Sequence, residues 1–250
     1  MSGHSHWATI KHKKGAADAK RGRIWSKIAR MIIVAAKNGG GDPDSNLTLR
    51  YAIDKAKGAN MPKDTIEKAV KKGAGGGEGA SFESVQYEGY GPSGVAIIVE
   101  ILTDNRNRTG PEIRRIFEKA GSALGTPGCV SWMFSKKGTI NIATSSIGED
   151  ELMELVLGAG ADDMQNVGEM YEITCDPTAY EGLKKAIEAK NIPIQSAEIA
   201  MIPQTTIAIS DADVARKIIK LMEAIEDHDD VQNAYSNFDI PPELIAEVSA

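Results

Sequence analysis

The hydrophobic pattern of this chain changes across a glycine-rich stretch at residues 73–79, and this change divides the fold. Before the stretch, apolar residues recur every three or four positions, which is typical of amphipathic helices. After it, apolar runs of strand length alternate with helical patterns. The stretch itself holds five glycines, which offer little to pack and are typical of a flexible linker. The sequence therefore predicts an α+β protein in which a linker joins a helical part to an α/β part.

The helical part is predicted to contain three helices, at about 16–37, 45–57 and 62–73. In the first helix, Ile24, Ile28 and Ile32 share an apolar stripe, and cationic side chains share a separate one. The glycines and the proline that follow should end this helix, because glycine favours a left-handed cap and proline prevents resumption. Gly73 is expected at the end of the third helix.

The α/β part is predicted to contain two strand–helix–strand regions that flank a self-contained unit. Strands are expected at 85–90, 95–102, 130–134, 205–209 and 231–235, with helices at 111–120 and 211–225. Residues 138–202 have the element order β-α-β-β-α-β, which is the ferredoxin-like split βαβ motif. We therefore predict that this unit is inserted into the other α/β domain. The predicted domains are 1–79, 80–135 plus 203–250, and 136–202.

Charge is segregated along the chain. Residues 1–72 contain 16 Lys and Arg against 6 Asp and Glu, whereas residues 73–250 contain 13 against 29. Because phosphate neutralisation depends on locally clustered cations, the basic end predicts nucleic-acid binding despite a sequence pI near 5.4. The predicted nucleic-acid-binding residues are His4, His6, Trp7, Lys11, His12, Lys13, Lys14, Lys20, Arg21, Arg23, Lys27 and Arg30. Trp7 and the imidazoles could stack on unpaired bases, or the segment could fold back on the helices through Trp7 and Ile10.

A second polar run lies between a predicted strand and a predicted helix N-terminus. Its candidate site residues are Asp104, Asn105, Arg106, Asn107 and Arg108. Helix N-termini attract anions, and clustered guanidinium groups reinforce this tendency, so the run is a candidate contact surface. The alternative is a turn stabilised by Asx hydrogen bonds, with its arginines paired to nearby acids.

The sequence predicts no catalytic constellation, no metal site and no cofactor. Glu226–Asp230 lacks the ligand spacing of a calcium loop and is expected to be a solvated turn. Among the four histidines, only His228 lies beyond the N-terminal segment, and no G-x-S-x-G motif is present. The start of the chain has no apolar signal region, no run reaches membrane-spanning length, and two distant cysteines suggest no disulfide framework. We therefore expect a cytoplasmic protein without a membrane partner.

Several motifs in the same order resemble the YebC/PmpR family along essentially the whole chain. They are Gly3–Trp7, Ile10–Lys14, Asp18–Gly22, Asp42–Pro43, Asn60–Asp64, Tyr87–Pro92, Thr103–Thr109, Asp229–Gln232 and Asn237–Asp239. The resemblance implies a helical domain followed by two α/β domains around a cleft, and no enzymatic activity. Bacterial members are described as DNA-binding transcriptional regulators. Mitochondrial relatives act as translational activators, of cytochrome c oxidase for example, and a ribosome-associated role has been argued.

We therefore expect a non-enzymatic nucleic-acid-binding regulator of gene expression, of the DNA-binding transcriptional type. The alternatives are a ribosome-associated translation factor that binds RNA and a protein-interaction scaffold. The residues themselves do not choose between DNA and RNA, because the segment from Asn38 to Ser45 is too long and glycine-rich for a helix-turn-helix. The polar run at 104–108 is expected in the cleft between the two α/β domains, acting together with the N-terminal segment.

Overall fold

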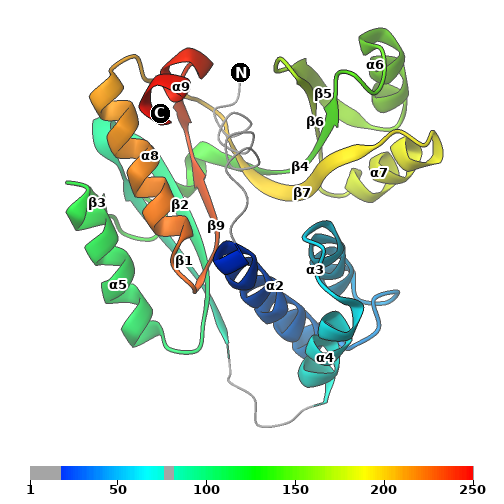
Figure 1. Ribbon diagram of the computed structural model, residues 1–250, viewed down its shortest axis with the longest axis horizontal. Coiled ribbons are helices and arrows are strands. Elements are labelled where there is room, and N and C mark those ends of the chain that lie inside the picture. Colours follow the sequence, from blue (N-terminus) through cyan, green and yellow to red (C-terminus); the bar gives the residue numbers. More distant parts are fainter. Residues whose placement is uncertain (1–17, 76–81, 250) are drawn as a thin grey trace.

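The computed structural model describes residues 18–75 and 82–249, which form a helical domain and two α/β domains (Figure 1). The predicted three-domain α+β fold is confirmed. Residues 76–79 of the predicted linker lie outside the described residues.

The helical domain consists of α2 (Asp18–Gly39), α3 (Leu47–Gly58) and α4 (Lys63–Ala74). Asn46 caps α3 by accepting a hydrogen bond from the Leu49 N–H at 3.1 Å, and its side-chain amide donates to the Ala35 carbonyl of α2 at 2.8 Å. Gly73 is buried inside α4, where a Cβ atom would lie 2.3 Å from the carbonyl oxygen of Ile33. This glycine therefore permits close packing of α4 on α2 rather than simply ending the helix.

The second domain is built on an antiparallel sheet of order β3-β1-β2-β9. The strands are β1 (Glu83–Tyr90), β2 (Ala96–Thr103), β3 (Ala123–Leu124) and β9 (Val231–Ser236). α5 (Arg106–Lys119) and α8 (Ala212–Glu226) cover one face through buried side chains such as Ile97, Phe117 and Ile218. The short strands β8 (Ile207–Ala208) and β10 (Phe238–Asp239) pair in parallel, and α9 (Pro242–Ser249) follows.

The third domain has the element order that the sequence pattern predicts. Its elements are β4 (Phe134–Ala143), α6 (Glu149–Gly158), β5 (Ala161–Asn166), β6 (Met170–Cys175), α7 (Tyr180–Ala189) and β7 (Ile194–Pro203). They form an antiparallel sheet of order β5-β6-β4-β7, with α6 and α7 packed on its apolar face. In the chain this sheet falls between β3 and β9 of the second domain. The residue limits of the three domains stay predictions.

The strand expected at Val130–Phe134 is wrong. Ser131–Met133 form a short 3₁₀ helix, η2, and β4 begins only at Phe134. The cause is the buried carboxylate of Glu88, which accepts hydrogen bonds from the backbone N–H groups of Gly128, Val130 and Ser131 at 2.8–2.9 Å. N–H groups held in this way cannot pair with a neighbouring strand.

Candidate nucleic-acid interface

The cationic stripe of α2 (Arg23, Lys27 and Arg30) contacts the second domain. Lys27 Nζ donates to the carbonyl oxygen of Glu226 at 2.5 Å, and Arg30 donates to that of Asp229 at 2.8 Å. These carbonyls lie at and just beyond the C-terminal end of α8, where unpaired carbonyl groups and the helix dipole favour cations. The last turn of α8 contains no basic residue, so α2 supplies the cations that this helix end lacks.

The polar run at 104–108 is largely helical, which corrects the expectation that its helix begins at Pro111. Arg106, Asn107 and Arg108 form the first turn of α5, and Asn105 is the N-cap residue. The Asn105 side chain accepts a hydrogen bond from the Arg108 N–H at 3.1 Å. Pro111 is accommodated inside the helix. The arginines therefore project from a helix N-terminus and not from a loop.

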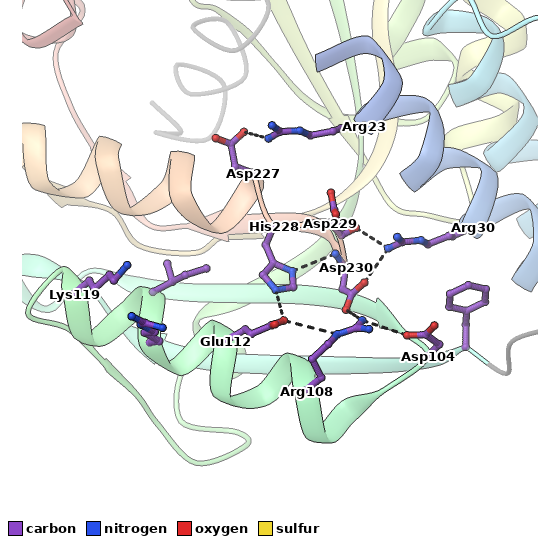
Figure 2. Close-up of a pocket in the computed structure, with 13 residues that line it drawn as sticks. Arg23, Arg30, Asp104, Arg108, Glu112, Lys119, Asp227, His228, Asp229 and Asp230 are labelled. Carbon is purple, nitrogen blue, oxygen red and sulfur yellow. Dashed lines mark hydrogen bonds and ion pairs between the residues drawn. The ribbon is translucent and has the colours of Figure 1, made fainter. Parts of the chain in front are cut away.

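Asp230 connects α2, α5 and the sheet (Figure 2). Its carboxylate accepts hydrogen bonds from the hydroxyls of Thr103 and Thr109 at 3.1 and 2.7 Å and from Arg108 at 2.7 Å. A fourth bond comes from Arg30 at 2.9 Å. Burial acts to raise the pKa of Asp230, but the bonds from Thr109, Arg108 and Thr103 outweigh it and hold the pKa below its ordinary value. The expectation of a solvated turn is therefore wrong for Asp230, which is only 3% exposed.

The side chains around Asp230 extend this network along α5. Arg108 also bonds to Asp104 at 3.2 Å and lies 3.9 Å from Glu112. The Glu112 carboxylate is in turn 3.0 Å from His228 Nε2. Asp104, Asn105 and Arg108 thus hold the start of α5, as the Asx-turn alternative predicts. By contrast, the side chains of Arg106 and Asn107 are exposed and bond to no part of the chain that the structure describes.

A pocket of about 860 Å³ opens beside this network. Its lining comes from α2, Phe82, Asp104, α5 and the acidic turn Asp227–Asp230, which connects α8 to β9. We call it the α2–α5 pocket. No residue of the third domain lines it. Of the polar run, Asp104 and Arg108 line this pocket between the helical and second domains, so the expected location between the two α/β domains is wrong for these two residues.

The remaining predicted nucleic-acid-binding residues stay predictions. His4, His6, Trp7, Lys11, His12, Lys13 and Lys14 lie outside the described residues. Lys20 and Arg21 belong to the first turns of α2.

Four further exposed cations on the helical domain are absent from the predicted set. They are Lys37, Lys68, Lys71 and Lys72, and none of their ammonium groups bonds to a side chain or carbonyl in residues 18–75 and 82–249. The signal that could have found the last three is the spacing of lysines on the polar face of a basic helix.

The described residues contain neither a candidate metal site nor a candidate membrane-spanning helix. Within residues 18–75 and 82–249, no group of three or more His, Cys, Asp or Glu side chains is arranged to hold a metal ion. No helix in the same ranges combines the length and the apolarity needed to cross a membrane.

Comparison with known proteins identifies the relatives of this chain. Residues 5–76 match the TACO1/YebC protein N-terminal domain, and residues 82–238 match the TACO1/YebC second and third domain. The chain belongs to the TACO1/YebC family. A family member from Syntrophobacter fumaroxidans, named "Probable transcriptional regulatory protein", is 51% identical over the full length of both chains. Another of that name from Trichlorobacter lovleyi is 56% identical over 96% of each chain. The crystal structure of a conserved hypothetical protein from Aquifex aeolicus is 48% identical, covers 94% of this chain and 97% of its own, and superposes with a TM-score of 0.86.

Proposed function

We propose that this protein is a non-enzymatic, nucleic-acid-binding regulator of gene expression, of the DNA-binding transcriptional type. The relatives from Syntrophobacter fumaroxidans and Trichlorobacter lovleyi are named "Probable transcriptional regulatory protein". The observation that carries the proposal is the set of exposed lysines at 37, 68, 71 and 72, whose charges meet no carboxylate within the described residues. Unpaired cations on a basic domain are the groups that replace counterions on a phosphate backbone, and this exchange drives sequence-independent affinity.

Contacts with the second domain determine which cations remain available to nucleic acid. Its acidic turn and the C-terminal end of α8 hold part of the α2 stripe, so those cations are partly neutralised inside the molecule. The exposed lysines of α4 are not engaged in this way. Nucleic acid should therefore contact α4 even when α2 stays docked on the second domain.

Charge reversal at the four lysines tests the proposal. In the full chain, K37E/K68E/K71E/K72E should lose most of its affinity for duplex DNA, and the slope of log K against log salt should become shallower by about 3 to 4. The matched control is K185E/K190E/K217E/K220E, which changes the net charge equally at exposed positions of α7, of its C-cap and of α8. The proposal fails if both variants bind equally well.

The class of nucleic acid is decided by crosslinking in cells followed by sequencing. Discrete promoter fragments are the expected result. Recovery of ribosomal RNA would replace the transcriptional role with that of a translation factor. Recovery of protein partners without nucleic acid would favour a scaffold.

A further inference from the structure

α5 presents a stripe of charged residues to the α2–α5 pocket. Arg108, Glu112, Arg115 and Lys119 recur at intervals of four, three and four residues, and all line the pocket. The first two are bonded within the molecule, to Asp230, Asp104 and His228. The side chains of Arg115 and Lys119 are exposed and have no bond to any residue in the described ranges. The distal half of the stripe therefore carries two cations that no described side chain neutralises.

A third available cation faces this pocket from α2. Arg23 lies 3.8 Å from Asp227, and the two side chains are 53% and 66% exposed. An exposed ion pair of this kind contributes little free energy and is easily displaced. Arg30 differs, because it donates to a buried carboxylate at 2.9 Å and belongs to the internal network (Figure 2). Arg30 and Arg108 both pair with Asp230, so the Asp230 carboxylate does not cancel the charges of Arg23, Arg115 and Lys119 in the pocket lining.

Among the described residues, the pocket lining offers no free aromatic surface for a base. Phe82 is its aromatic lining residue apart from His228, and the Arg30 guanidinium lies 6.0 Å from the centre of its ring. The His228 ring is held between Glu112 and the backbone N–H of Asp230. The groups that remain available are two guanidinium groups and one ammonium group, which bind phosphate oxygens, and a contact to phosphate carries no direct sequence information.

We propose that Arg23, Arg115 and Lys119 form a phosphate-binding site at the mouth of the α2–α5 pocket. The ligand is the phosphodiester backbone of a nucleic acid, which then bridges the helical and second domains. This inference rests on the proposed function and adds a second contact, on an α/β domain of opposite overall charge. The acidic turn weakens phosphate binding at this site, because Asp227 competes with phosphate for Arg23.

The experiment uses the full chain with labelled probes of about 20 nucleotides, one a DNA duplex and one a single-stranded RNA. R115E/K119E should bind the preferred probe roughly tenfold or more weakly, and its salt slope should be shallower by about 2. D227N should bind about twofold to fivefold more tightly, because Arg23 is released. The matched control is R114E/K217E, which makes the same charge change at exposed positions outside the pocket.

Three outcomes are decisive. Weak binding by R115E/K119E with normal binding by the control supports the site, provided that both variants melt at the wild-type temperature. Equal binding by the two variants overturns the site and leaves the proposed function intact. Failure of the wild-type protein to bind either probe overturns the proposed function, and the site with it. The probe that shows the larger loss identifies the source of the phosphate.

Discussion

At the scale of single residues, two buried acids have opposite electrostatic environments. Asp230 is surrounded by donors that keep its carboxylate charged. Glu172 lies on β6 directly opposite Asn141 of β4, and the Oδ1 atom of Asn141 is buried without a hydrogen-bond partner. Burial raises the pKa of Glu172 to about 7. The carboxyl therefore favours its neutral form below about pH 7.

This environment predicts a pH-dependent effect of Glu172→Gln. The folded-state pKa of Glu172 is about 7, and its ordinary value is 4.5, so the wild-type protein loses stability as the pH rises between these values. Glutamine removes the ionisation. E172Q should therefore be more stable than wild type at pH 8 by roughly 1–3 kcal/mol and should show no gain at pH 4. Urea denaturation at both pH values measures this. A stability difference that is the same at both would contradict a raised pKa.

At the scale of elements, close packing of α4 on α2 depends on Gly73. Alanine normally favours a helix over glycine by about 1 kcal/mol, but here a Cβ atom would lie 2.3 Å from the backbone oxygen of Ile33. Because a backbone atom cannot move aside alone, Gly73→Ala should destabilise the helical domain by about 1–3 kcal/mol. Gly58→Ala is the control, since nothing lies within 4 Å of its added Cβ. Thermal melts that rank G73A at or above G58A would contradict this account.

Local patterns account for most of what the sequence predicts at this scale. The helices of the first domain and the split βαβ unit follow from hydrophobic periodicity, which depends on neighbouring residues alone. The conformation of Val130 and Ser131 could not be predicted, because it depends on Glu88, which is more than 40 residues earlier in the chain. The sequence predicts the start of α5 too late, at Pro111, because proline is typical of a first helical turn. The Asn105 cap is nevertheless visible in the sequence. Charge clustering identifies a basic domain but not which cations are neutralised, since Arg30 and Asp230 are 200 residues apart.

At the scale of the whole molecule, polar contacts join the helical domain to both α/β domains. The α2 stripe contacts the acidic turn and the end of α8 in the second domain. On α3, Asp54 pairs with Lys184 of α7 at 2.9 Å, and the ring of Tyr51 meets that of Tyr180 edge-on at 5.5 Å. Lys55 of α3 contacts Asn233 of the second domain at 3.3 Å and Glu198 of the third at 3.6 Å. Charge pairs, hydrogen bonds and one aromatic contact therefore join the basic domain to both α/β domains.

A charge exchange tests how far these pairs set the arrangement of the domains. D54K places a lysine against Lys184, and K184D places an aspartate against Asp54, so either substitution alone should repel α3 from α7. Each single variant should then increase the radius of gyration in small-angle X-ray scattering, because the helical domain is released from α7. D54K/K184D restores an opposite-charge pair and should return the radius of gyration toward wild type. Single variants that stay as compact as wild type would show that the Tyr51–Tyr180 contact and the Arg30–Asp230 bond hold the domains without this ion pair.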